Sequence, residues 1–192
     1  MCIRDSPGTS AAARMDLYLA LVCFTQMVGD GESALAQRTH GLLAAHAERL
    51  LDVLARDALD GAEVGQTVAL TTLAHLVRYE PNAKRVPLGE LLVQRGYLRS
   101  LVLHLQTLDV PLQEVLSPDP TSLNAQYVYE ALLSFLSRVA QTRSGAQQLL
   151  DAHLFKVLAR VDFVSLRPDA NATHDALDDT GFLPAVAERY AA

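Results

Sequence analysis

The stretch SLNAQYVYEALLSFLSRVAQ, residues 122–141, decides the fold class of this 192-residue chain. Its larger apolar side chains recur every three or four residues, which is the spacing of one face of an α-helix. These are Val128, Leu132, Phe135, Leu136 and Val139. Just upstream, Pro118 and Pro120 exclude both a helix interior and an inner strand. The stretch therefore predicts a long amphipathic helix from about Ser122 to Gln141.

The same spacing recurs on both sides of this helix, with Gly, Pro or Asp at the breaks. Gly41 is a candidate break inside the second helix, and Ser144 is a candidate cap for a short helix after residue 141. No run of useful length alternates apolar and polar residues, so we expect an all-α fold. The other expected helices span about 11–28, 33–59, 62–79, 87–96, 97–108, 111–116, 154–161 and 182–190.

A weak motif suggests how these helices are arranged. A break followed by two apolar residues and a third three positions on occurs at 96–101, 153–158 and 181–186. Such pairs clamp a helix onto its neighbour, and their irregular spacing favours an irregular α-solenoid of HEAT- or armadillo-like helical pairs. We expect a disordered leader at 1–10, the solenoid segment at 11–166, an acidic loop or linker at 167–180 and a terminal helix at 181–192.

Charge excludes several classes of function. The net charge is −6, and Lys84 and Lys156 are the chain's lysines, so no stripe of positive charge is available for nucleic acid or an anionic membrane. The longest unbroken apolar run, Leu17 to Phe24, is shorter than a bilayer crossing. Cys2 and Cys23 form neither a metal spacing nor a disulfide framework. We expect Cys23 to be a buried, reduced thiol.

No pattern of residues predicts catalysis, a cofactor or a metal. The histidines lack HExxH or i,i+4 spacing, and no GxSxG, P-loop or GxGxxG occurs. The carboxylates lie at helix ends or in a polar loop, where we expect them to be solvated. The sequence therefore predicts a protein that is not an enzyme. The histidines are His40, His46, His75, His104, His153 and His174, and the clustered carboxylates that could have formed an acid–base pair are Asp52, Asp57, Asp60, Glu63, Asp175, Asp178 and Asp179.

Two features leave an interaction role open. Tyr127 and Tyr129 either contact a partner or cap the core with the hydroxyl in water, and we expect the second. The adjacent pair Lys84-Arg85 is too small for a phosphate site and fits a solvated loop tip.

The segment YEALLSFLSRVAQTRSGAQQLLDAHLFKVLARVDFVSLRPD, residues 129–169, resembles the large α-helical scaffold nucleoporins of the inner ring of the nuclear pore complex. A weaker similarity covers Leu51 to Leu76. His153 stands where such a segment would carry Gly. The elements that match are packing residues: Leu132, Phe135, Leu136, Val139, Gly145, Leu149, Leu150, Leu154, Phe155 and Leu158.

The resemblance implies a structural role. Members of this family are far longer than 192 residues, so the chain would be a fragment of an α-solenoid at the nuclear pore complex in the nuclear envelope. It would bind other scaffold or linker nucleoporins and support nucleocytoplasmic transport, with no nucleic acid, cofactor or membrane insertion. The alternative is an armadillo- or HEAT-like adaptor or transport receptor that binds peptides. The absence of Trp and the presence of only Asn82, Asn124 and Asn171 disfavour that alternative.

Overall fold

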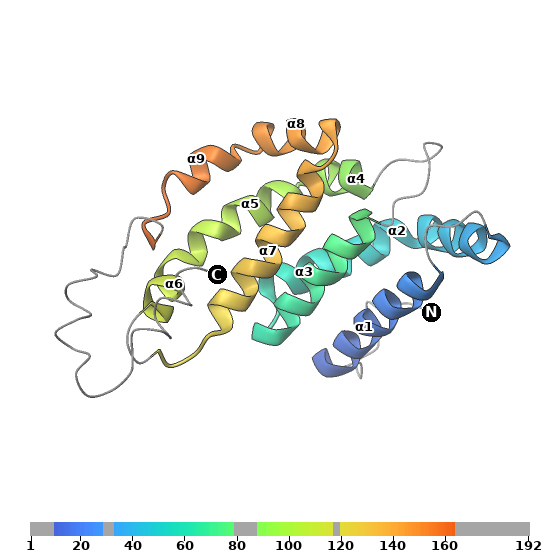
Figure 1. The fold of residues 1–192 in the computed structure, drawn as a ribbon, viewed down its shortest axis with the longest axis horizontal. Helices are drawn as coiled ribbons and strands as arrows, with labels where there is room; N and C mark the ends of the chain where they lie inside the picture. The colour runs from blue at the N-terminus through green and yellow to red at the C-terminus, as the bar shows by residue number, and fades with distance from the viewer. Residues whose placement is uncertain (1–9, 29–32, 79–87, 117–119, 164–192) are drawn as a thin grey trace.

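The computed structural model describes residues 10–28, 33–78, 88–116 and 120–163. Nine α-helices lie in these ranges, and no residue within them is in a strand, which confirms the all-α prediction for this part of the chain (Figure 1). They are α1 (Ala11–Val28), α2 (Ala34–Asp60), α3 (Glu63–Arg78), α4 (Leu88–Gln94), α5 (Tyr97–Thr107), α6 (Asp109–Val115), α7 (Asn124–Ala140), α8 (Arg143–Asp151) and α9 (Leu154–Leu158).

The bounds of α2 follow from local chemistry at its two ends. At the start, the Ser33 side chain accepts a hydrogen bond of 3.1 Å from the Ala36 N–H, which satisfies one of the unpaired donors of the first turn. At the end, the Gly61 N–H donates to the Asp57 carbonyl at 3.0 Å. A Cβ on Gly61 would collide with that carbonyl oxygen. A residue without a side chain therefore closes the helix.

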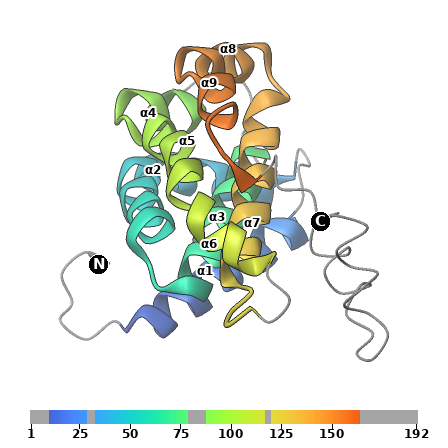
Figure 2. The same cartoon turned by 90° about the vertical axis from the view of Figure 1, so that its left-hand side faces the viewer.

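The main core lies around α3, which contacts α1, α2 and α7 (Figures 1 and 2). Leu54 of α2, Leu70 and Leu73 of α3, and Leu132 and Phe135 of α7 are fully buried there. Burying one such side chain contributes about 1.5–3 kcal/mol relative to leaving it in water. The long stripe on α7 is thus the face that packs on α3.

A second set of contacts surrounds α5, which packs against α2, α4, α6, α8 and α9. Its inner residues Leu98, Leu101, Val102 and Leu105 are buried. The short helices α8 and α9 lie one after the other along the α5 side of the molecule (Figure 2). The helices α4, α5, α6, α8 and α9 are each too short to be stable alone, so their stability comes from packing on their neighbours.

Several local predictions are wrong. Gly41 does not break α2, which is continuous from Ala34 to Asp60, because an exposed glycine costs a helix too little to end it. Thr142, not Ser144, caps α8 by accepting from the Gly145 N–H at 3.0 Å. The third error concerns α6, which begins at Asp109 rather than Pro111. Pro111 still lies in the first turn, where its missing N–H has no intrahelical partner to lose.

The prediction for Cys23 is also wrong, because its thiol is exposed. The apolar run Leu17–Phe24 encircles α1, so it contains outward-facing positions as well as inward-facing ones.

Parts of the predicted organisation lie outside the described residues. They are most of the leader, the break at Ser117-Pro118-Asp119, the loop with Lys84-Arg85, the linker at 167–180 and the terminal helix at 181–192. Ser10, which we assigned to the leader, is described, and its Oγ accepts a hydrogen bond of 3.2 Å from the Ala13 N–H at the start of α1.

Candidate functional site

The histidines do not form a chemical centre in the described part of the chain. No group of three or more His, Cys, Asp or Glu residues there is arranged to hold a metal ion. His75 of α3 is half-buried, with its Nε2 at 2.8 Å from the Thr25 Oγ1 of α1. His153 is exposed, and His174 lies outside the described residues. His40 and His46 lie on α2, whereas His75 lies on α3 and His104 on α5.

His104 of α5 is half-buried, and burial lowers the pKa of its imidazole, an effect that Asp60 partly offsets. Its Nδ1 lies 2.9 Å from the Thr107 Oγ1, while its buried Nε2 has no hydrogen-bond partner. The neutral form is therefore favoured. Asp60 is the carboxylate that acts on the imidazole, but no hydrogen bond joins these two described residues, so they do not form the directly bonded pair of an acid–base site.

Asp57 corrects the expectation that the carboxylates are solvated. Arg14 donates to it through Nε at 2.9 Å and Nη2 at 3.2 Å, and the Tyr18 hydroxyl donates at 2.8 Å. The Asp57 side chain is only 14% exposed. Three charge-assisted hydrogen bonds thus attach α1 to α2, and the carboxylate has a structural role. The predicted solvation failed because α1 covers the end of α2.

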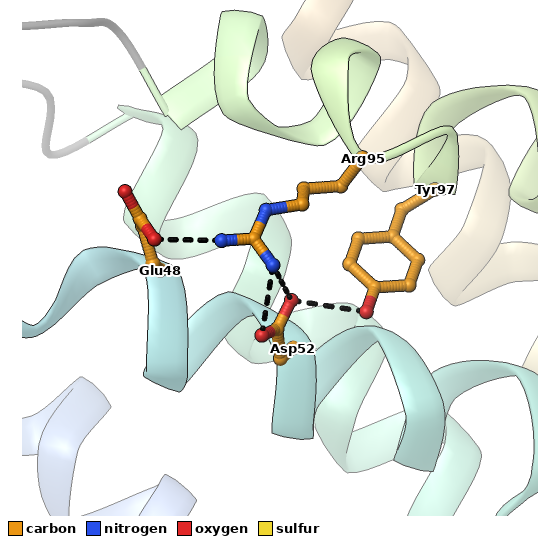
Figure 3. Close-up of polar contacts among 4 residues, drawn as sticks. All are labelled: Glu48, Asp52, Arg95 and Tyr97. Carbon is orange, nitrogen blue, oxygen red and sulfur yellow. Dashed lines mark hydrogen bonds and ion pairs between the residues drawn. The ribbon is translucent and has the colours of Figure 1, made fainter.

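A second polar cluster joins α2 to the turn between α4 and α5 (Figure 3). Arg95 donates from Nη2 to Glu48 at 2.6 Å and from Nη1 to Asp52 at 3.3 Å, and the Tyr97 hydroxyl donates to Asp52 at 3.0 Å. Glu48 and Asp52 are four residues apart on one face of α2, which lets a single guanidinium reach both. Arg95 is 42% exposed, so its ion pairs contribute at most about 1 kcal/mol each.

The tyrosines in these clusters stay protonated. Burial raises the pKa of Tyr18, and the hydrogen bond to Asp57 raises it further. Burial is also the main cause of the raised pKa of Tyr97, with Asp52 adding to it. A phenol beside a carboxylate acts here as a donor only. Both clusters are therefore connectors between helices.

The sequence-predicted packing residues occupy different environments. Six of them are buried on α7 or α8: Leu132, Phe135, Leu136, Val139, Gly145 and Leu149. Leu154 and Leu158 are half-buried on α9. Gly145 lies where the start of α8 crosses the end of α7, and a Cβ there would collide with the Val139 carbonyl. Only glycine fits this crossing.

Leu150 and Phe155 do not pack in the described structure, since they are 48% and 68% exposed. The expectation that these two side chains are packing residues is therefore wrong for the described structure. A left-handed turn at His153, with a φ of 63°, separates α8 from α9. On α9, which follows this turn, Val157 faces the core and Phe155 faces outward.

His153 also explains the glycine expected at its position. Left-handed backbone costs a residue with a Cβ about 1–2 kcal/mol, whereas glycine adopts it freely. The turn keeps its hydrogen bonds despite this cost, with the His153 N–H donating to the Leu150 carbonyl at 2.9 Å. The chain thus retains the turn geometry with an unfavourable residue in it.

Comparison with known proteins decides what kind of scaffold this helical arrangement represents. The family model described as "Nuclear pore complex scaffold, nucleoporins 186/192/205" matches residues 2–192. The chain belongs to this nucleoporin family. The match includes both the helices around α3 and the α7–α9 segment that carried the resemblance.

Two curated relatives of the nucleoporin chain are named nuclear pore complex protein Nup205. The one from Homo sapiens is 31% identical over 188 residues, which is 97% of this chain and 9% of that protein. The one from Drosophila melanogaster is 28% identical over 144 residues, 74% of this chain and 7% of that protein. The chain therefore spans less than a tenth of the length of the curated relatives it matches.

Helix α1 of this nucleoporin chain exposes several large apolar side chains. Leu17, Leu19, Phe24 and Met27 are 48% to 90% exposed, and the buried residues of α1 are Tyr18 and Thr25. By length and composition alone, α1 is the one described helix that could cross a membrane, a test that buried helices and signal sequences also pass. Its three hydrogen bonds to Asp57 show instead a helix docked on α2.

Tyr127 and Tyr129 differ in their surroundings. Tyr129 is half-buried and its ring meets Phe163 edge-on, with centroids 5.1 Å apart. Tyr127 is 52% exposed. Capping of the core therefore describes Tyr129, while Tyr127 stays open to a partner.

Sequence reasoning missed the two polar connectors of this nucleoporin chain. A signal for one was present, because Arg14 and Tyr18 are four residues apart and must share a face of α1. Their acceptor is 39 or 43 residues away in sequence, and no local pattern pairs it with them.

Proposed function

We propose that this chain is a structural segment of the nuclear pore complex scaffold at the nuclear envelope, acting through protein–protein contacts and supporting nucleocytoplasmic transport. The observation that carries the proposal is the family match over residues 2–192. The names of both relatives are consistent with this place of action.

The proposed architecture is an irregular α-solenoid. In its support, helices that follow one another in sequence pack on each other: α2 on α3, α4 on α5, α7 on α8 and α8 on α9. The contact of α3 with α7 adds a longer-range layer, which fits an irregular stack better than a strict repeat. The packing residues named above are the proposed signature of this stack.

The proposed partners are other scaffold or linker nucleoporins, and no cofactor, nucleic acid, membrane insertion or catalysis is part of the proposal. Its support is the use of the polar groups. The carboxylates of Asp52 and Asp57 join helices to one another.

The peptide-binding adaptor receives less support. Asn124 is at the first position of α7 and half-buried, so it does not form part of a ladder of exposed amides along a groove. Asn82 and Asn171 lie outside the described residues.

The experiment is binding of the purified chain to a panel of recombinant scaffold and linker nucleoporins, with a panel of transport-signal peptides alongside. The scaffold proposal expects binding to at least one nucleoporin that Leu136→Asp abolishes and Arg143→Ala leaves intact. Binding to the peptides alone would favour the adaptor instead. Circular dichroism on the same samples shows whether a lost interaction reflects lost helix.

A further inference from the structure

Helix α1 lies at one edge of the molecule and carries an apolar stripe that its neighbours leave exposed (Figures 1 and 2). Leu17, Phe24 and Met27 are 54%, 48% and 90% exposed, and Ala20 between them is also exposed. These four positions follow steps of three, four and three residues, which place them on one side of the helix. We define the α1 outer stripe as Leu17, Ala20, Phe24 and Met27.

The contacts that hold α1 on the molecule do not use this stripe. The Tyr18 hydroxyl donates to Asp57 of α2 at 2.8 Å, and Leu21 packs against the core. The Thr25 Oγ1 lies 2.8 Å from the His75 Nε2 of α3. Large apolar side chains of α1 therefore face water while two of its hydroxyls are buried, which is the reverse of an ordinary surface helix. Such a patch marks a surface that another molecule covers.

The absence of charge along α1 restricts what can cover the stripe. No Asp, Glu, Lys or Arg occurs from Leu17 to Val28. A partner with charged side chains at the facing positions would lose their hydration and gain no ion pair from α1 in return. The stripe thus selects an uncharged apolar helix face, and α1 itself presents one.

An antiparallel pair of α1 helices also matches the stripe to itself in size. A two-fold axis at residue 22 places Ala20 of one copy against the partner's Phe24, and Leu17 against the partner's Met27. The small side chain of Ala20 leaves room for the phenyl ring, and the longer side chains fill both ends. Large residues against small ones at facing positions let two helices interdigitate.

We propose that the α1 outer stripe docks the same stripe of a second copy of this chain, in an antiparallel two-fold pair. The stripe extends over about 15 Å at 1.5 Å per residue. A contact of this length falls short of the roughly 1,200 Å² of a standard interface, so the dimer is weak and reversible. The inference does not use the proposed scaffold function, which neither requires nor excludes a dimer.

Sedimentation velocity of the whole 192-residue chain from about 1 μM to about 1 mM tests the dimer. A monomer should convert to a dimer and to nothing larger, because a two-fold contact closes on itself. Leu17→Ser with Phe24→Ser should raise the dimer dissociation constant about tenfold or more. The matched control is Leu103→Ser with Leu150→Ser, which removes side chains 43% and 48% exposed on α5 and α8 and should leave that constant unchanged. Circular dichroism checks that both variants fold.

Charges introduced at the two ends of the stripe test the antiparallel register. Leu17→Glu with Met27→Lys sets opposite charges against each other at both ends of the pair, whereas Leu17→Lys with Met27→Lys sets like charges there. The first variant should dimerise about tenfold more tightly than the second. The second variant brings the net charge of −6 closer to zero, which by itself would favour association, so overall charge does not explain this order.

Cys23 gives a positional check, since its thiol is exposed and lies one residue from the two-fold axis. In a Cys2→Ser background it is the chain's remaining cysteine. A short bismaleimide should then join two copies through Cys23. The control chain combines Cys2→Ser and Cys23→Ser with Ser134→Cys at an exposed position of α7, and it should give far less covalent dimer.

Several results would overturn the second copy as occupant. They are a monomer up to about 1 mM, equal loss of dimer in the Leu103 and Leu150 control, and growth beyond a dimer. A monomer that binds phosphatidylcholine vesicles, and loses this binding with Leu17→Ser and Phe24→Ser, would assign the stripe to a lipid surface instead. A monomer that binds no vesicles would leave the stripe to a further helix of a longer nucleoporin chain.

Discussion

The helices α7 and α1 are similar in length and opposite in construction. The apolar stripe of α7 is buried, with Leu132 and Phe135 fully enclosed. In α1, Leu17, Phe24 and Met27 are exposed, while the buried residues are Tyr18 and Thr25. Helix α7 is held by apolar packing on α3, whereas α1 packs on α3 and is also attached to α2 by hydrogen bonds to Asp57. Apolar residues on a helix thus show where burial is possible, and the partner helix decides which of them are used.

Substitution inside the α7 face should have the largest effect. Leu136 is 3% exposed, so Leu136→Asp forces a carboxylate into the core and should lower the free energy of unfolding by about 4 kcal/mol or more. Urea unfolding followed by circular dichroism measures it. The control Arg143→Ala changes an exposed residue and should stay within about 0.5 kcal/mol. Normal stability of Leu136→Asp would contradict the assignment of α7 to the core.

The crossing of α7 and α8 tests how tightly this region is built. Gly145→Ala would push a Cβ against the Val139 carbonyl, which is backbone and cannot rotate away. We expect a loss of about 2–3 kcal/mol, within the range for overpacked sites. Gly41→Ala is its opposite, because nothing lies within 4 Å of a Cβ there. That change should stabilise α2 by about 0.5–1 kcal/mol, and thermal unfolding of both variants distinguishes the two glycines.

The polar attachment of α1 is tested by Asp57→Ala, which leaves Arg14 and the buried Tyr18 hydroxyl without their acceptor. We expect a loss of about 2 kcal/mol, expressed mainly as faster amide hydrogen exchange in α1. Asp52→Ala breaks the more exposed cluster and should cost about 1 kcal/mol or less. Unchanged exchange in α1 after Asp57→Ala would mean that apolar contacts hold this helix too.

The turn before α9 should respond in the stabilising direction. His153→Gly removes the Cβ from a left-handed residue whose side chain is exposed, and we expect a gain of about 0.5–1 kcal/mol. Equilibrium unfolding in urea measures the gain. His46→Gly, on an exposed position of α2, is the control and should destabilise by a comparable amount.

The smallest effect concerns pH. Burial lowers the pKa of His104 in the folded chain, while the unfolded chain keeps an ordinary value of about 6.5. The unfolded state therefore takes up the proton first, so stability is complete above about pH 6.5 and falls as the pH drops toward the folded value. His104→Gln should remove this part of the pH dependence. If the stability difference between wild type and variant stays constant from about pH 8 to pH 5, His104 does not contribute to it.

Much of the fold was accessible from sequence because helical burial has a regular period. The stripes on α2, α3 and α7 predicted helix positions to within a few residues, and the resemblance in 129–169 agrees with the family match. The prediction for Phe155 failed because hydrophobic spacing does not show which side of a short helix meets its neighbours, and on α9 it is Val157 that is buried.

The sequence by itself determined that the chain is helical, that it lacks the spacing of known catalytic and metal motifs, and which faces are apolar. These properties depend on residues within one or two turns of each other, so the printed order of residues contains them. The tertiary structure alone decided that Asp57 holds α1, that Arg95 bridges Glu48 and Asp52, and that Leu35 and Leu42 remain exposed. Each of those outcomes depends on which helix lies beside which, and more than 40 residues separate Arg14 from Asp57 and Asp52 from Arg95.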